Sequence, residues 1–309
     1  MKKGLLFLFL SISIMSYSQK NSQHIEWISF SWVSFSVSGK NFEKAAIDIP
    51  VTIDKLPYKF VMQFDLGATY TMFYENTLKP FFEKYPSLKA KVDTTKRNQD
   101  NPILQNVDLQ LGEVGFKNIG VTLLNNHGYE YLLDSINAET EIRIGTIGAD
   151  LVQNKVLIID YQLNRLAITD TLPAEYENAS FECSRIEQGR IKIPFKINEK
   201  VEDLMFDTGA SIFKLTTTKQ NASRIGGNQV IDTLTVPSWD GDATLYGLET
   251  IAPIMFGDKI LESSIVYYSE DTSWDNFYQS ENMWGLTGNA YFLNYVIIID
   301  YKNNRFGLK

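Results

Sequence analysis

Hydrophobic and polar residues alternate with a period of two along several short stretches of the chain. This pattern, typical of strands with one buried face, is found at 46–53 (AIDIPVTI), 107–112 (VDLQLG) and 190–197 (RIKIPFKI). Two further stretches, 156–161 (VLIIDY) and 295–301 (YVIIIDY), are continuously apolar and β-branched, as in strands buried on both faces. Helical patterns are confined to 75–85 and a short turn at 217–225. The sequence therefore predicts an all-β protein with few short helices.

Four landmarks occur twice along the chain in the same order. The most specific are FDLGAT at 64–69, which recurs as FDTGAS at 206–211, and the run 144–168, whose Gly, Asp, Tyr, Asn and Arg positions recur without a gap at 284–308. Such a repeat indicates one unit of about 140 residues used twice. We expect two related β-barrel-like lobes, residues 19–175 and 176–309, which meet in the polar stretch 170–188.

The first 18 residues, MKKGLLFLFLSISIMSYS, resemble a cleaved signal peptide. They combine a short basic start, an apolar stretch interrupted by serine, and small residues before the predicted cleavage point. A membrane anchor or a buried N-terminal segment is the alternative. Beyond this segment no stretch has the length and hydrophobicity of a membrane span. We expect an exported bacterial protein, periplasmic or secreted.

The net charge and the few cysteine and histidine residues limit the chemistry that the chain can perform. The net charge of −8, with no basic cluster, argues against nucleic acid or anionic lipid as the main partner. Cys183 is the single cysteine, so no internal disulfide can form. A Ser-His-Asp or Cys-His hydrolase needs a histidine base, and His24 and His127 both lie in segments that indicate solvated polar residues. Any hydrolytic chemistry must use carboxylates, and we expect neither a metal nor a cofactor.

The two Asp-X-Gly-Ala motifs supply such carboxylates. Asp65 and Asp207 each follow an apolar run, and Gly67 and Gly209 allow a sharp turn with close approach. One copy alone is typical of an ordinary turn. Two copies in related halves predict that pseudo-two-fold symmetry brings the carboxyls face to face, where they titrate as a coupled pair. The ionised oxygen can then accept a proton from water while its protonated partner polarises a peptide carbonyl.

With these motifs the chain resembles the pepsin-like and retropepsin-like aspartic proteases in their two-lobed, single-chain form. Asp207-Thr208-Gly209 matches the Asp-Thr-Gly motif of that family, and Asp65-Leu66-Gly67 matches it at two of three positions. Segments 146–148 and 286–288 resemble the apolar pair and glycine that pass beneath each catalytic turn, and the resemblance covers most of residues 45–309.

The resemblance implies a bilobal fold, a monomer, a peptide or protein substrate, and a dyad of Asp65 and Asp207 that shares one proton. The residues it assigns to the support of the active-site turns are Gly67, Ala68, Thr208, Gly209, Ala210 and Ser211.

Three departures from the family pattern bear on activity. Leu66 replaces the hydroxyl residue that links the two turns, which removes a hydrogen bond worth about 1 kcal/mol. Residues 91–106 contain no flap tyrosine, whereas Trp239 and Tyr246 in the second half are candidate flap residues that could equally brace a hairpin. Residues 19–44 include no basic prosegment.

Two functions stay open at this point. The first is an exported aspartic endopeptidase that uses Asp65 and Asp207. The second is a catalytically inactive, protease-like protein that binds a peptide or glycan, which the change at Leu66 and the missing flap tyrosine favour.

Overall fold

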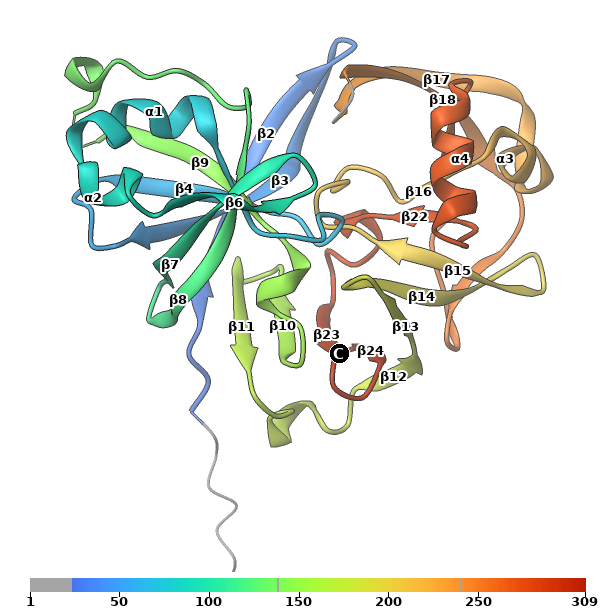
Figure 1. The fold of residues 1–309 in the computed structure, drawn as a ribbon. Coiled ribbons are helices and arrows are strands. Elements are labelled where there is room, and N and C mark those ends of the chain that lie inside the picture. Colours follow the sequence, from blue (N-terminus) through green and yellow to red (C-terminus); the bar gives the residue numbers. More distant parts are fainter. Residues whose placement is uncertain (1–23, 138, 239–240) are drawn as a thin grey trace, which may run out of the picture.

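Three β-sheets and a few short helices make up the protein (Figure 1). The computed structural model describes residues 24–137, 139–238 and 241–309. The predicted signal peptide at 1–18 and Trp239 lie outside the described residues. Within the described ranges, no helix has both the length and the hydrophobicity needed to cross a membrane. The mainly β composition confirms the predicted fold class at this level.

The first of the larger sheets contains eight strands, all from the first half of the chain. Their order across the sheet is β2 (Ser31–Val37), β3 (Lys40–Ile53), β4 (Lys59–Phe64), β9 (Glu141–Ile147), β5 (Met72–Tyr74), β8 (Val114–Leu124), β7 (Asn101–Leu111) and β6 (Val92–Asn98).

The second larger sheet contains ten strands, all from the second half. Its path is β17 (Gly226–Ser238), β18 (Gly241–Thr250), β21 (Ile265–Ser269), β16 (Leu215–Thr217), β22 (Gly285–Thr287), β15 (Lys200–Phe206), β14 (Arg190–Ile197), β19 (Ile254–Phe256) and β20 (Lys259–Ile260), with β13 (Arg185–Glu187) paired to β14.

The third sheet joins the halves. Its six strands are β1 (Ile28–Ser29), β11 (Arg165–Thr169), β10 (Val156–Asp160), β23 (Val296–Asp300), β24 (Arg305–Leu308) and β12 (Ser180–Cys183). At its centre β10 pairs antiparallel with β23, and Ile158 lies opposite Ile298. These two residues are equivalent positions of the sequence repeat, so the pairing has the symmetry of a two-fold axis through the sheet.

The helices are short, as the sequence predicts. They are α1 (Glu75–Lys84), α2 (Pro86–Lys89), α3 (Lys219–Ile225) and α4 (Thr272–Ser280), with 3-10 turns η1 (Leu133–Ser135), η2 (Ala149–Leu151), η3 (Ala174–Tyr176) and η4 (Asn289–Tyr291). The helical patterns at 75–85 and 217–225 lie where α1 and α3 form, whereas α4 was not predicted. The apolar residues of α4, Trp274, Phe277 and Tyr278, have helical spacing, which was the signal available.

The expected barrel-like closure is wrong in detail, because neither larger sheet closes evenly. In the first half β3 also pairs with β7, but only over Val51, Thr52 and Ile53. In the second half β19 pairs with β14 over two residue pairs and the sheet stays open. A barrel needs its first and last strands to pair along their length. Here the N-terminal part of β3 pairs with β2, and β17 pairs along its length with β18.

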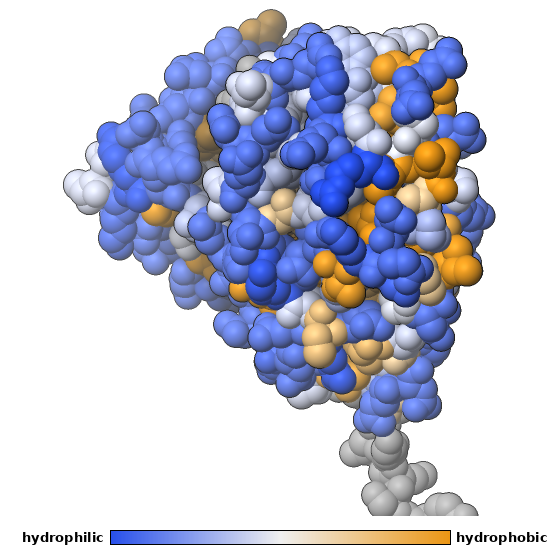
Figure 2. Space-filling model, turned by 90° about the vertical axis from the view of Figure 1, so that its right-hand side faces the viewer, coloured by the Kyte–Doolittle hydropathy of each residue, from blue (hydrophilic) through white to orange (hydrophobic). Residues whose placement is uncertain are grey.

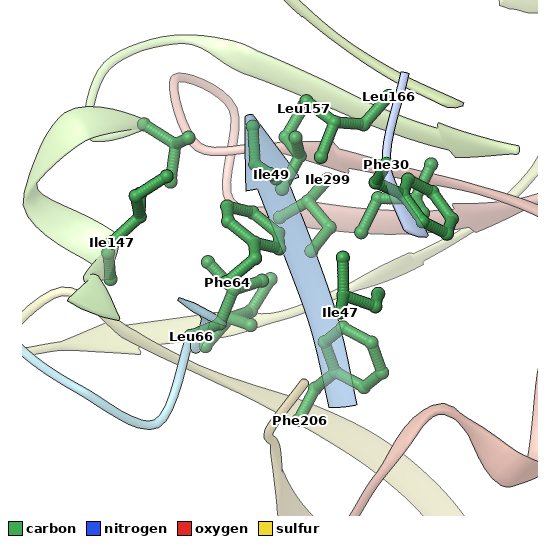
Figure 3. Packing of buried hydrophobic residues seen from close by; sticks show 14 of the residues in the cluster. Phe30, Ile47, Ile49, Phe64, Leu66, Ile147, Leu157, Leu166, Phe206 and Ile299 are labelled. Carbon is green, nitrogen blue, oxygen red and sulfur yellow. The ribbon is translucent and has the colours of Figure 1, made fainter. Parts of the chain in front are cut away.

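The main hydrophobic core contains residues from both halves. Figure 3 shows Phe64 and Leu66 of the first half packed near Phe206 and Ile299 of the second, all fully buried. The exterior differs: the face of the second half seen in Figure 2 is mostly hydrophilic, with hydrophobic residues in separate areas. The Asp motifs therefore lie at the end of strands whose inner faces share one core.

Candidate active site

The first Asp motif is held by three neighbouring strands. Asp65 directly follows β4, and the chain re-enters the sheet at β5. The strand β9 lies between them, parallel to β4 and antiparallel to β5. The backbone N–H of Asp65 donates to the carbonyl of Ile147, at the end of β9, at 3.0 Å. Segment 146–148 therefore passes beside the first turn.

The second Asp motif has the same construction. Asp207 directly follows β15, and β22 lies between β15 and β16 with the same parallel and antiparallel pairing. The N–H of Asp207 donates to the carbonyl of Thr287 at 2.9 Å. The repeat in the sequence is thus also a repeat of backbone structure, and both aspartates begin a turn between buried strands.

The two turns meet, and each glycine faces the carboxyl of the other half. The N–H of Gly67 donates to an oxygen of Asp65 at 2.9 Å and to one of Asp207 at 3.2 Å, and Gly209 N–H donates to Asp207 at 2.7 Å. A methyl group on Gly67 would lie 2.5 Å from the carboxyl carbon of Asp207, and one on Gly209 would lie 2.6 Å from that of Asp65. Only a residue without a side chain fits between the carboxyls.

The environments of the two carboxyls differ. Asp65 is buried, whereas Asp207 is partly exposed. Burial, followed by the nearby charge and hydrogen bonding of Asp207, raises the pKa of Asp65 well above its ordinary value, against the lowering effect of the Ala68 and Gly67 N–H groups. The pair is therefore built to keep a proton at a pH where an exposed aspartate has lost it.

Thr208 links the two turns from one side. Its hydroxyl accepts from the N–H of Leu66 at 2.9 Å and donates to the carbonyl of Phe64 at 2.9 Å, and its side chain is fully buried. Leu66, at the equivalent position of the first half, instead packs into the main core (Figure 3). The absence of a hydroxyl at position 66 leaves Thr208 as the hydroxyl bridge of this pair.

Asn289 supports the second turn in a way the sequence analysis missed. Its side-chain amide donates to the Ser211 hydroxyl at 2.6 Å and to the Thr208 carbonyl at 3.2 Å, and its oxygen accepts from the Tyr161 hydroxyl at 2.6 Å. The repeat places Ala149 at the equivalent position of the first half. The change from Gly-Ala to Gly-Asn between the two copies was the available signal.

The first turn is braced differently. The Thr71 N–H and hydroxyl both donate to one carboxylate oxygen of Asp150, at 2.8 and 2.6 Å, and the Gly148 N–H donates to the Thr71 hydroxyl at 3.1 Å. Within the described residues, the buried hydroxyl of Tyr301, the equivalent of Tyr161, has no hydrogen-bond partner. The pseudo-symmetry of the backbone is thus not matched by the polar contacts beneath it.

Of the two candidate flap residues, the structure describes only Tyr246. Tyr246 lies within β18, half-buried, and its ring packs 5.6 Å from that of Tyr268 on the neighbouring strand. Trp239 is outside the described residues. The position of Tyr246 favours the alternative in which it braces the hairpin.

The β2–β3 hairpin makes an unforeseen contact between the halves. Its residue Val37 packs in a small hydrophobic cluster with Leu234, Val236 and Phe213 of the second half, beside Ala210 of the second turn. Lys40 forms an ion pair with Asp232 at 2.5 Å. Figure 1 shows this hairpin reaching from the first half toward β17 and β18. The N-terminal hairpin therefore bridges the halves close to the Asp207 turn.

A hollow of about 630 Å³ opens beside the first turn rather than over the dyad. Thr69 and Tyr70 line it, together with Gln153, Gln188 and Asn304. No charged side chain is among its lining residues.

Neither histidine of the chain lies at this site. His24 is exposed near the start of the described residues, and the ring of His127 packs against Tyr74 at 4.7 Å. Among the residues that the structure describes, no group of three or more His, Cys, Asp or Glu side chains is placed to share a metal ion. Cys183 is exposed in β12.

Neither a protein-family model nor a curated protein matches the chain.

Proposed function

We propose that the protein is an exported aspartic endopeptidase with a bilobal, aspartic-protease-like fold, in which Asp65 and Asp207 form the catalytic dyad. The observation that carries the proposal is the meeting of the two Asp turns, with the carboxyl of each half against the glycine of the other. The raised pKa of Asp65 supports it, since a shared proton is what this chemistry needs.

The two environments suggest how the roles divide. Asp65, buried, holds the shared proton and donates it toward the oxygen of the substrate carbonyl. Asp207, partly exposed, accepts a proton from a water molecule held between the carboxyls. The water oxygen bonds to the carbonyl carbon, and collapse of the tetrahedral intermediate breaks the C–N bond as the leaving nitrogen takes a proton from the dyad. No covalent enzyme intermediate is required.

The substrate class follows from this chemistry. We expect an extended peptide or an unfolded protein segment as substrate, and a monomeric enzyme that acts in the periplasm or outside the cell. The signal peptide at 1–18 is a prediction from the sequence alone.

The test compares three purified proteins, the wild type, Asp65→Asn and Asp207→Asn, on a mixed peptide library between about pH 3 and about pH 8. We expect cleavage by the wild type on the acidic side and none by either variant, since an amide cannot exchange the proton. Cleavage that survives either substitution would refute the dyad. Peptide binding without cleavage at any pH would support the second candidate, an inactive binding protein, for which the buried Leu66 is the structural argument.

A further inference from the structure

Arg190, from the second half, contacts the first Asp turn directly. It is the first residue of β14, and its guanidinium Nε donates to the carbonyl of Gly67 at 2.8 Å. This hydrogen bond joins residues from different halves of the chain, as the Thr208 bridge does. A charged donor makes it stronger than a bond between neutral groups.

The guanidinium is held in place by groups of its own half. One terminal nitrogen of Arg190 pairs with the carboxylate of Glu281 at 2.6 Å, and the guanidinium carbon lies 5.7 Å from the ring centre of Phe277. Both charged side chains are largely buried, at 18% and 10% exposure. Glu281 caps the C-terminal end of α4, so its backbone position is fixed by the helix.

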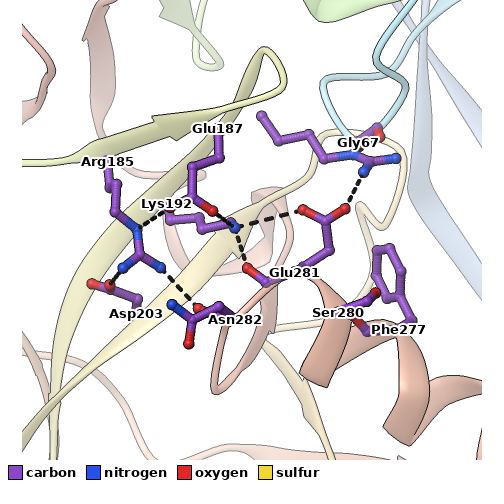
Figure 4. Close-up of polar contacts among 10 residues, drawn as sticks. Gly67, Arg185, Glu187, Lys192, Asp203, Phe277, Ser280, Glu281 and Asn282 are labelled. Atoms are coloured by element: carbon purple, nitrogen blue, oxygen red, sulfur yellow. Dashed lines mark hydrogen bonds and ion pairs between the residues drawn. The ribbon is translucent and has the colours of Figure 1, made fainter.

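Glu281 is in turn fixed from its other side. The fully buried ammonium of Lys192 contacts the Glu281 backbone carbonyl and lies 3.5 Å from its carboxylate, and it also pairs with Glu187. Arg185 continues the chain by pairing with Glu187 at 3.0 Å and with Asp203 at 3.3 Å. Figure 4 shows this row of alternating charges ending at Gly67. Buried ions are tolerated only when each is paired in this way.

The contact has no counterpart at the equivalent position of the repeat. Aligning IDIP at 47–50 with IKIP at 191–194 places Ala46 opposite Arg190, and Ala46 has no side chain that could reach the second turn. The first turn, which contains Leu66 in place of a hydroxyl residue, is thus the one that receives the arginine.

The geometry gives the contact a specific consequence for the dyad. A peptide bond is planar and trans, so the carbonyl of Gly67 and the N–H of Ala68 point in opposite directions from one plane. Arg190 fixes the carbonyl side of this plane. The N–H side donates to a carboxyl oxygen of Asp65 and to its backbone carbonyl, each at 3.2 Å. The orientation of the plane therefore sets one of the hydrogen bonds that Asp65 receives.

We propose that Arg190 is a positioning residue: it fixes the Gly67–Ala68 peptide plane across the interface between the halves, and so aims the Ala68 N–H at Asp65. The effect on hydrolysis rests on the proposed function, whereas the structural role does not. The charged groups that face the guanidinium and the turn are Glu281, Lys192, Asp65 and Asp207.

The first test of this role needs no activity. Amide hydrogen exchange is measured in Arg190→Met on the peptides that cover 64–71 and 206–213. We expect exchange at 64–71 to rise about tenfold, the size of one lost charged hydrogen bond, while the equivalent turn at 206–213 stays within about twofold. Arg185→Met, which breaks the same row of charges away from Gly67, is the matched control and should leave 64–71 unchanged. Unchanged exchange at 64–71 in Arg190→Met, or an equal rise in both variants, would overturn the proposal.

Kinetics give a second readout if the wild type cleaves peptides. We expect Arg190→Met to lower kcat about tenfold with little change in KM, because Arg190 contacts the turn and not the substrate. In the pH profile of kcat, the upper apparent pKa of Arg190→Met should be higher than that of the wild type. The Ala68 N–H favours the ionised form of Asp65, and the variant weakens this hydrogen bond and removes the guanidinium charge. Arg224→Met, at an exposed position on α3, controls for the loss of a positive charge. If the wild type cleaves nothing, the proposed function fails and the exchange result still decides the role of Arg190.

Discussion

The hydroxyl of Thr208 offers the sharpest test of how the two turns are held together. Thr208→Val keeps the shape of the side chain and replaces the hydroxyl with a methyl group. The N–H of Leu66 and the carbonyl of Phe64, both at 2.9 Å from that hydroxyl, then lose this partner inside a fully buried site.

The expected cost follows from these two groups. A buried backbone group left without a partner costs about 1–3 kcal/mol, so two of them cost about 2–6 kcal/mol, and we expect a loss of about 3 kcal/mol in the free energy of unfolding. Two matched variants separate the cost of the unpaired backbone groups from the cost of changing a buried side chain. Thr287→Val removes one buried hydroxyl that donates to Lys214 within the second half, so it should cost less than half as much. Thr208→Ser keeps the hydroxyl and should cost about 1 kcal/mol for the lost methyl group.

Denaturant unfolding followed by tryptophan fluorescence gives the free energies, and peptide hydrolysis gives the functional effect. Since the bridge fixes one turn against the other, we expect Thr208→Val to lower kcat by about 10–100-fold and Thr208→Ser to stay near the wild type. A stability loss in Thr208→Val no larger than that in Thr287→Val would refute the reasoning, since the link between the halves would then contribute no more than a bond within one half.

Three further variants address the dyad and its surroundings. Gly67→Ala should reduce the rate of hydrolysis about 100-fold, because the added methyl group would displace the Asp207 carboxyl. Gly115→Ala, where no atom lies within 4 Å of the added methyl group, should be as active as the wild type. Equal activities of the two variants would contradict the geometry. The pKa of Asp65 is raised in the folded protein, so its contribution to stability is fully present below the ordinary aspartate pKa of 3.8 and is lost as pH rises through the folded pKa. The free energy of unfolding of Asp65→Asn should therefore fall less than that of the wild type between about pH 4 and about pH 7. Parallel stability curves for the two proteins would count against the assignment. Asp232→Asn should speed amide exchange in the β2–β3 hairpin at neutral pH, since it removes the carboxylate that pairs with Lys40. Burial alone would raise the pKa of Asp232, but its contacts with Lys40 and Tyr267 lower the pKa, so the wild-type hairpin should loosen only in acid. Unchanged exchange in the variant would show that the ion pair does not hold the hairpin.

Local patterning was enough to locate five of the strands, in β3, β7, β10, β14 and β23. The alternating stretch at 190–197 is β14, the alternating stretch at 46–53 lies within β3, and the apolar run at 156–161 contains β10, whose residues are all buried. Alternation with a period of two predicts such strands because each strand buries one face against the core, whichever strands it pairs with. The helix α4 was missed because it is short and largely polar, with only three aromatic residues at helical spacing.

The sequence by itself determined that the chain contains one backbone unit used twice, with an aspartate and a glycine at the same place in each copy. That information is local, because a buried strand followed by Asp-X-Gly-Ala specifies its own turn. Only the tertiary structure decided how the two copies are joined and how each turn is supported. The Thr208 bridge spans 142 residues of sequence, the Arg190 contact with Gly67 spans 123, and the Asn289 contact with Tyr161 spans 128. No periodicity encodes such contacts, since each depends on where one side chain from one half meets the backbone or side chain of the other.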